Sequence, residues 1–227
     1  MQNDAASPTI RRMRKLIFIL ALVGCSDDNK TTVDAAPAVA LDCTTYCNEI
    51  QMNCTGANTQ YSDAAHCMAT CTSFPKGALT DTGGQNTLGC RIYHAGSPAA
   101  MTPATHCPHA GPGGDKTSVA APGGTCGDAC TSFCTLEIQA CGVTGDAGGN
   151  GQYASQAACV AACANFPNKD KLYTTASGGD SLACRLYHAT NAVISGNAKT
   201  HCPHTAQTPM NPATGTNPCL AGSPATP

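Results

Sequence analysis

The chain has 227 residues with 17 cysteines and no tryptophan, and only 11% of its residues are charged and 4% aromatic. So few large side chains exclude a large aromatic-rich enzyme core, and covalent crosslinks must replace much of the missing burial. The formal net charge of −2 excludes a strongly basic surface, so we expect no nucleic-acid partner.

The N-terminal 24 residues have the pattern of an export signal. A basic stretch at residues 11–15 precedes a short apolar run from Leu16 to Val23, and Met13 is an alternative start. The run is shorter than the roughly 20 residues that span a bilayer as a helix. We therefore expect residues 1–24 to be a signal peptide.

The end of this run, Leu22-Val23-Gly24-Cys25, closely resembles the lipobox of bacterial lipoproteins. The resemblance implies that Cys25 is the lipidated first residue of the mature protein, which is then anchored to the membrane of the bacterial cell envelope. Because no Asp directly follows Cys25, it also implies the outer membrane. Residues 25–42 are small and polar and are expected to form a flexible tether.

After Cys25 the cysteines form two sets of eight with matching intervals. The first set is Cys43, Cys47, Cys54, Cys67, Cys71, Cys90, Cys107 and Cys126; the second is Cys130, Cys134, Cys141, Cys159, Cys163, Cys184, Cys202 and Cys219. This pattern predicts two tandem homologous repeats, 43–126 and 130–219, followed by a disordered tail at 220–227. An even number of cysteines in an exported chain indicates disulfide bonds throughout.

Each repeat is expected to consist of short helices and irregular loops, so the fold class is mainly α, small and disulfide-rich. The Cys-x3-Cys pairs place two sulfurs on one helical face. A third helix is predicted over Leu88 to His94 and over Leu182 to His188. The Phe-Pro dipeptides at 74–75 and 166–167 are expected to end the second helix of each repeat.

Two antiparallel helices crosslinked by two parallel disulfides satisfy the Cys-x3-Cys spacing. The arrangement resembles the twin Cys-x3-Cys hairpin of small mitochondrial intermembrane-space chaperones, in spacing only. Our hypothesis for the pairing is Cys43–Cys71, Cys47–Cys67, Cys130–Cys163 and Cys134–Cys159. The other pairings cannot be read from the sequence.

The candidate core of the first repeat is small, with Met52, Met68, Leu79, Tyr93 and Met101 among its few bulky residues. Each crosslink typically stabilises a domain by about 2–4 kcal/mol. We therefore expect reduction to unfold the protein.

Six of the seven histidines fall at matched repeat positions, namely His94, His106, His109, His188, His201 and His204. Three imidazoles suit Zn or Cu, and the spacing His-x-x-His can place two ligands on one turn. A disulfide between Cys90 and Cys107 is one way to join the His94 helix to this turn. Each repeat is thus a candidate metal site.

Two alternatives stay open for these histidines. Two of them can serve as axial ligands of a non-covalent haem, although the motif for covalent haem attachment is missing. They can also be structural residues that satisfy backbone carbonyls. The matched Arg91, Tyr93, Arg185 and Tyr187 are candidate binding residues with the same structural alternative.

The paired motifs Cys-Arg-x-Tyr-His and His-Cys-Pro-His resemble a tandem pattern in uncharacterised cysteine-rich bacterial lipoproteins, over about residues 43–219. No motif of a serine hydrolase, zinc protease or nucleotide-binding loop is present, so we expect no catalytic residues. The predicted function is a binding or structural module of the envelope that contacts a protein, a glycan or a small ligand. A metal- or haem-binding protein is the alternative, and a metal-dependent or redox enzyme is a further one.

Overall fold

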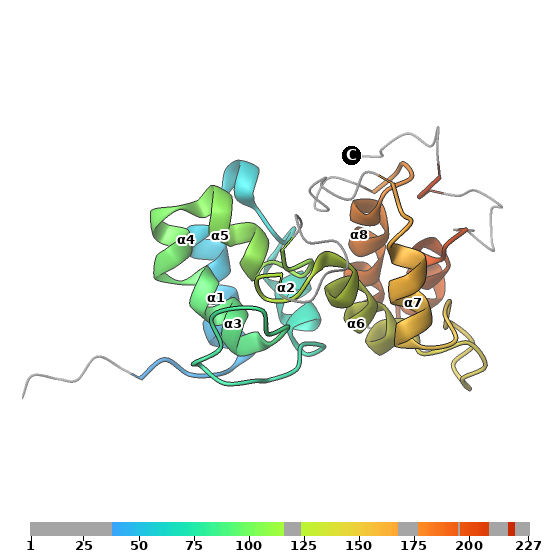
Figure 1. Cartoon of the computed structure of the whole chain (residues 1–227), viewed down its shortest axis with the longest axis horizontal. Helices are drawn as coiled ribbons and strands as arrows, with labels where there is room; N and C mark the ends of the chain where they lie inside the picture. The colour runs from blue at the N-terminus through green and yellow to red at the C-terminus, as the bar shows by residue number, and fades with distance from the viewer. Residues whose placement is uncertain (1–37, 116–123, 168–176, 195, 209–217, 221–227) are drawn as a thin grey trace, which may run out of the picture. The chain divides into compact units, whose positions relative to one another are not determined.

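The computed structural model describes residues 38–115, 124–167, 177–194, 196–208 and 218–220 (Figure 1). The predicted signal peptide, Cys25, most of the tether and residues 221–227 of the tail lie outside these ranges. Residues Val39–Pro227 form one compact unit, which contains both predicted repeats. In the described ranges the regular elements are helices, apart from one isolated bridge between Asp115 and Asp128. The mainly α, disulfide-rich fold class is confirmed.

The helices follow a similar order in the two halves of this unit, although η1 and α4 have no counterpart among the described residues of the second half. The first half contains α1 (Cys43–Asn53), η1 (Gly56–Asn58), α2 (Ala64–Cys71), α3 (Leu88–Ala95), α4 (Ser97–Met101) and α5 (Pro103–Ala110). The second half contains α6 (Ala129–Cys141), α7 (Gln156–Cys163), α8 (Leu182–Val193), α9 (Ala198–His201) and η3 (Cys202–Thr205). The predicted third helices therefore begin at the expected residues. The α2 helix ends at Cys71, before the Phe-Pro dipeptide that was expected to end it.

Short polar side chains determine where the main helices begin. The side chain of Asp42 accepts a hydrogen bond from the N–H of Thr45 at the start of α1, and Asp128 accepts one from Thr131 at the start of α6. In the same way Thr87 precedes α3 and Ser181 precedes α8. An oxygen at this position satisfies an N–H group that has no partner within the helix.

The four disulfides predicted from the Cys-x3-Cys pairs are confirmed. Cys43–Cys71 and Cys47–Cys67 join α1 to α2, and Cys130–Cys163 and Cys134–Cys159 join α6 to α7. Each half is therefore built on a helical hairpin closed by two parallel crosslinks. The matching pairs agree with a duplicated sequence, and the duplication itself stays a prediction.

Each of the other four disulfides has one cysteine in a histidine-bearing helix. They are Cys54–Cys107, Cys90–Cys126, Cys141–Cys202 and Cys184–Cys219. The proposed Cys90–Cys107 bond is therefore wrong. Cys107 joins α5 to the end of α1, while Cys90 closes the loop that leads into α6, because these partners are brought together by tertiary packing.

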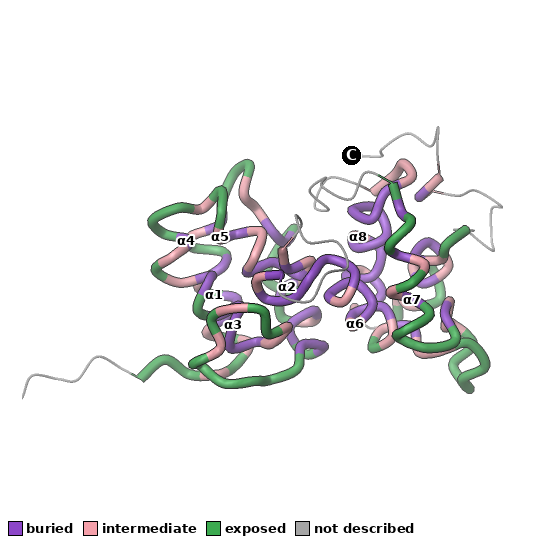
Figure 2. Tube along the Cα trace, in the orientation of Figure 1, coloured by how far each residue is buried: buried purple, intermediate pink, exposed green. Residues whose placement is uncertain are grey.

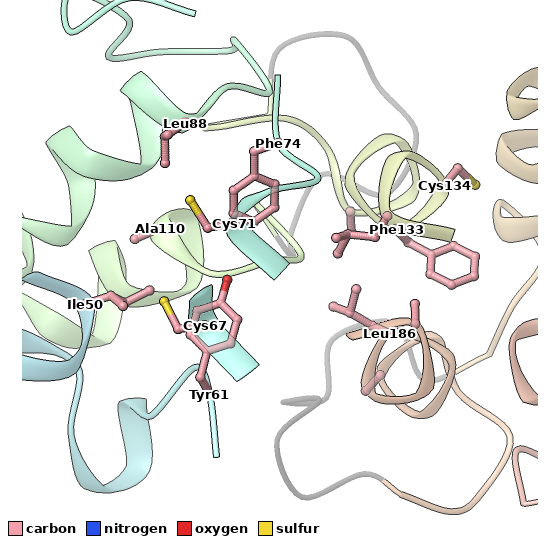
Figure 3. Close-up of a cluster of buried hydrophobic side chains, with 14 of the residues drawn as sticks. Ile50, Tyr61, Cys67, Cys71, Phe74, Leu88, Ala110, Phe133, Cys134 and Leu186 are labelled. Carbon is pink, nitrogen blue, oxygen red and sulfur yellow. The ribbon is translucent and has the colours of Figure 1, made fainter. Parts of the chain in front are cut away.

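Buried positions lie in both halves (Figure 2), and the larger of two clusters of buried apolar residues has members from both (Figure 3). Figure 3 shows Ile50, Tyr61 and Phe74 from the first half and Phe133 and Leu186 from the second. Disulfide sulfurs fill space that larger side chains would otherwise occupy, and most of the cysteines are fully buried. The core therefore consists of crosslinks together with a few aromatic and aliphatic residues.

Several bulky residues expected in the core lie on the surface. Met52, Met68, Leu79, Tyr93 and Met101 are all exposed, Met101 with 77% of its surface accessible. Met52, Met68 and Met101 lie on the outer faces of short helices, Tyr93 is the one exposed residue of α3, and Leu79 lies in the loop between α2 and α3. These positions were therefore assigned wrongly to the core.

Candidate metal centres

The first histidine triad lies where α3 meets α5. His94 is in the last turn of α3, and His106 and His109 lie three residues apart on α5, where side chains share one face. Cys107, between them, is bonded to Cys54 and holds α5 against the end of α1. One nitrogen from each imidazole lies within 4.8 Å of the other two. The predicted ligands are thus brought together.

The second triad repeats this arrangement with a different backbone. His188 comes from α8, His201 ends α9 and His204 lies in η3, and their nitrogens also lie within 4.8 Å of one another. The Nδ1 atoms of His188 and His201 are 2.9 Å apart, the same distance as between those of His94 and His106. The paired rings are nearly parallel in both triads, at 29° and 23°.

A backbone carbonyl orients the central imidazole of each triad. His94 Nε2 lies 3.2 Å from the carbonyl oxygen of Thr82, and His188 Nε2 lies 3.2 Å from that of Ser177. Because a carbonyl can only accept a hydrogen bond, we assign the ring proton to Nε2. The Nδ1 lone pair of the neutral ring then faces the other two imidazoles. Histidines that bind metals are commonly oriented in this way.

Burial keeps most of these imidazoles neutral. Loss of hydration, together with the neighbouring imidazoles, lowers the pKa of His188 to about 3 and that of His204 to about 4. The pKa values of His94, His109 and His201 are also lowered, again mainly by burial. A neutral imidazole is the form that binds a metal ion.

One nitrogen in each triad is buried and has no hydrogen-bond partner among the described residues. These atoms are Nδ1 of His109 and Nε2 of His204. Buried polar atoms nearly always have a partner, because an unsatisfied one costs about 1–3 kcal/mol. The imidazole clusters are therefore not fully explained as internal hydrogen-bond networks.

The donor set fits a small transition-metal ion. Ligands placed about 2.0–2.1 Å from a tetrahedral zinc ion lie roughly 3.3 Å from one another, close to the 3.2 Å between the Nδ1 atoms of His188 and His204. Three imidazoles and no charged ligand suit Zn²⁺ or Cu²⁺. Two axial haem ligands must leave space for a macrocycle between them, and nitrogens 2.9 Å apart leave none.

The matched arginines are buried and make internal contacts. Arg91 and Arg185 are almost completely buried, each with its guanidinium 4.1 Å from the centre of a phenylalanine ring, Phe74 or Phe166. Arg91 donates to the carbonyls of Gly111 and Thr87. These contacts fit the alternative that the arginines satisfy backbone carbonyls, and their role in ligand binding stays a prediction. The same alternative also fits His94 and His188 in part, since each donates to one carbonyl.

The matched tyrosines lie beside the triads. The Tyr93 ring packs edge-on against His94 with centroids 5.1 Å apart, and Tyr187 packs in the same way on His188 at 5.2 Å. Tyr93 is 45% exposed, whereas Tyr187 is partly covered. Tyr93 is thus the more accessible of the two tyrosines to an external ligand.

Sequence reasoning missed two features of these centres. The orienting groups of Thr82 and Ser177 are backbone carbonyls, so their side chains carry no signal. The disulfides Cys90–Cys126 and Cys184–Cys219 lie next to His94 and His188, with both sulfurs and a ring nitrogen within 4.8 Å of one another. The Cys-x3-His spacing, one helical turn, was the available sign of this contact.

The sequence profile of the BfoA family C-terminal domain matches residues 14–128. A protein named "Aurasperone B biosynthesis cluster protein A" from Aspergillus niger is 39% identical over 118 residues, which cover 51% of this chain and 37% of the relative. "Bifonsecin B biosynthesis cluster protein A" from Aspergillus brasiliensis is 42% identical over 118 residues, covering 51% of this chain and 38% of the relative. The chain thus spans well under half the length of these relatives. No solved structure shows significant similarity.

These fungal relatives overturn the bacterial interpretation of the N-terminus. The predicted identity as a bacterial lipoprotein and the predicted location in a bacterial outer membrane are wrong. A basic stretch and a short apolar run are common to export signals in general. Only the four residues Leu22–Cys25 indicated lipidation, and they lie outside the described residues. In the described ranges no helix is both long and apolar enough to cross a membrane.

Proposed function

This chain belongs to the family defined by the BfoA C-terminal domain, and from its two imidazole triads we propose that it is a metal-binding protein. Each triad holds one Zn²⁺ or Cu²⁺ ion through three histidine nitrogens. The observation that carries this proposal is the convergence of three imidazoles at two separate places, each with its central ring oriented by a carbonyl.

Three protein ligands leave one position of a tetrahedral ion for water or another small ligand. A bound ion would then act as a Lewis acid or, in the case of copper, exchange an electron. The protein contributes a pre-formed ligand set, because the disulfides Cys54–Cys107 and Cys141–Cys202 hold the ligand-bearing helices in place without metal. The relatives are named for biosynthesis clusters, and we place this metal-binding role in the biosynthesis of a small molecule.

Metal stoichiometry tests the proposal. The protein with its disulfides intact is titrated with Zn²⁺ or Cu²⁺, dialysed and analysed for metal content. We expect two ions per chain, one after His94→Ala or His188→Ala, and none after both substitutions, because each removes the central ligand of one triad.

His66→Ala is the matched control, since His66 contacts Asp63 and Asn191 and belongs to neither triad. It should retain two ions. Wild-type protein that binds neither metal, or a double variant that still binds two ions, contradicts the proposal.

A second candidate function, binding of a flat aromatic molecule, is supported by a cavity of about 320 Å³ beside Tyr93. Val39, Leu79, Ile92, Tyr93 and Pro98 supply its apolar lining, and Glu49 contributes a carboxylate that can accept a hydrogen bond. The cavity lies where the chain turns from α3 into α4. In the second half α8 continues to Val193 and has no such turn.

The fluorescent phenol 2-naphthol is a suitable probe for this cavity, because it offers a flat ring and one hydroxyl donor. Tyr93→Ala should weaken its binding at least tenfold, and the matched variant Tyr187→Ala should leave it unchanged. Equal effects of the two substitutions would rule out a specific site at this cavity.

A further inference from the structure

Each histidine triad lies next to a disulfide that shares its central histidine. Sγ of Cys90, Sγ of Cys126 and a nitrogen of His94 all lie within 4.8 Å of one another. Cys184, Cys219 and His188 form the same cluster in the second half. Neither Cys43–Cys71 nor Cys130–Cys163 belongs to any such donor cluster among the described residues.

Local structure places the sulfur and the imidazole together. Cys90 precedes His94 by one turn of α3, and Cys184 precedes His188 by one turn of α8, so each pair shares a helix face. The loop after α5 brings Cys126 to the same place, where its N–H donates to the carbonyl of Gly83 at 2.7 Å. The neighbouring carbonyl, that of Thr82, binds His94.

From this geometry we propose that the disulfide beside each triad is a latent pair of thiolate ligands. Opening the bond creates an alternative metal site with two sulfurs and one nitrogen, made of Cys90, Cys126 and His94 in the first half. Cys184, Cys219 and His188 form it in the second half. The inference rests on the proposed metal-binding function, because His94 and His188 serve both donor sets.

The chemistry requires a dithiol reductant. Its two thiols transfer two electrons and two protons to the protein disulfide, which becomes two cysteine thiols while the reductant becomes a disulfide. The metal ion then forms two bonds to sulfur and displaces the two thiol protons, since a coordinating thiol is deprotonated. Sulfur ligands favour Zn²⁺ and Cu⁺ over harder ions. Reduction thus changes which metal the centre prefers.

The backbone at Cys126 favours opening of the first of these bonds. Cys126 has a φ of 54°, and it is the one non-glycine residue with a positive φ in the described ranges. A side chain is disfavoured in this left-handed region, and such strain persists only where the surrounding structure imposes it. A free Cys126 is able to leave this conformation and reorient its sulfur toward a metal ion.

The variant Cys90→Ala tests the proposal without a reductant. It leaves Cys126 as a free thiol beside His94 while the other seven disulfides remain. Loaded with Co²⁺, this variant should show an intense near-ultraviolet thiolate-to-cobalt band that is missing from the wild-type protein. Cys43→Ala is the matched control, because it frees Cys71 away from any histidine cluster, and it should show no such band.

The outcomes separate the two proposals. Wild-type protein that binds no Co²⁺ contradicts the metal-binding function itself. Cobalt bound by Cys90→Ala through nitrogen alone overturns the latent thiolate site. If the variant does not fold, the wild-type protein with bound Co²⁺ is treated with a limiting amount of dithiothreitol. The same band must then appear, and Cys90 and Cys126 must resist alkylation; a missing band refutes the proposal.

Discussion

At the residue scale, internal contacts compensate the burial of two arginines but not that of Glu137. Arg91 and Arg185 lie in the interior with their guanidinium groups stacked on phenylalanine rings and bonded to carbonyls. Arg185 also forms an ion pair with Asp180 at 2.9 Å. A buried charge loses its hydration, and these contacts compensate that loss.

Glu137 lacks this compensation. Its side chain is fully buried in α6, Oε2 has no hydrogen-bond partner within the described part of the chain, and Oε1 lies 3.0 Å from the Thr205 hydroxyl. Burial raises its pKa to about 7, and hydrogen bonds from Thr205 and Gln152 only partly oppose this shift. At the matching place in α1 stands Ile50, also buried.

Replacing Glu137 with Gln should therefore stabilise the protein at high pH. Between pH 4.5 and about 7 the folded state retains a proton that the unfolded state releases, so stability falls as the pH rises through this window. The shift corresponds to about 3 kcal/mol, so we expect Glu137→Gln to gain about 1–3 kcal/mol at pH 8 relative to its effect at pH 4. Urea unfolding at the two pH values measures this difference, and equal effects would contradict the raised pKa.

At the element scale, the position of α3 depends on one glycine. A Cβ atom on Gly89 would overlap the backbone carbonyl of Ala78, because the loop before α3 crosses the helix at this point. The N–H of Leu88 donates to the carbonyl of Pro75 at 2.8 Å and holds this loop in place. In α8 the matching position is Ala183.

We expect Gly89→Ala to destabilise the protein by about 1–3 kcal/mol, because backbone must move to accept the methyl group. Helix propensity alone predicts the opposite sign, a gain of about 1 kcal/mol. The reverse change in the other half, Ala183→Gly, should cost about that propensity difference. Thermal unfolding of both variants distinguishes the explanations, and a more stable Gly89→Ala variant would refute the packing argument.

At the scale of the whole molecule, the neutral imidazoles couple folding to acidity. Five of the six triad histidines have lowered pKa values, so below their ordinary pKa of about 6.5 the unfolded chain binds protons that the folded chain does not. Stability must therefore fall as the pH falls from about 6.5 toward 3. The titration of Glu137 changes stability in the opposite direction between pH 4.5 and 7, but this is the effect of one carboxyl against that of five imidazoles.

The prediction is a loss of stability between pH 6.5 and 4 that becomes shallower in the variant His188→Gln/His204→Gln. Glutamine is neutral at both pH values and removes the two strongest shifts. Urea unfolding of metal-free protein at several pH values measures the slope, and a slope unchanged by the double substitution would contradict it. Saturating Zn²⁺ should raise the melting temperature of the wild-type protein at pH 7 and lose this effect near pH 4.

The sequence by itself determined the local architecture. Two cysteines one helical turn apart must share a face, so Cys43/Cys47 and Cys67/Cys71 predict a crosslinked hairpin without knowledge of anything distant. The short polar residues before the main helices act within three residues, and the matched histidines could be recognised as a set because they recur. A four-residue motif such as Leu22–Cys25 carried too little information to establish the source of the chain.

The tertiary structure decided every feature that depends on contacts between distant segments. It paired Cys90 with Cys126 rather than with Cys107, it buried Glu137 and the arginines, and it brought the carbonyls of Thr82 and Ser177 to the central imidazoles. Backbone carbonyls are present at every residue and so leave no trace in the side-chain pattern. Which of them meets a histidine is settled only when long loops close and pack.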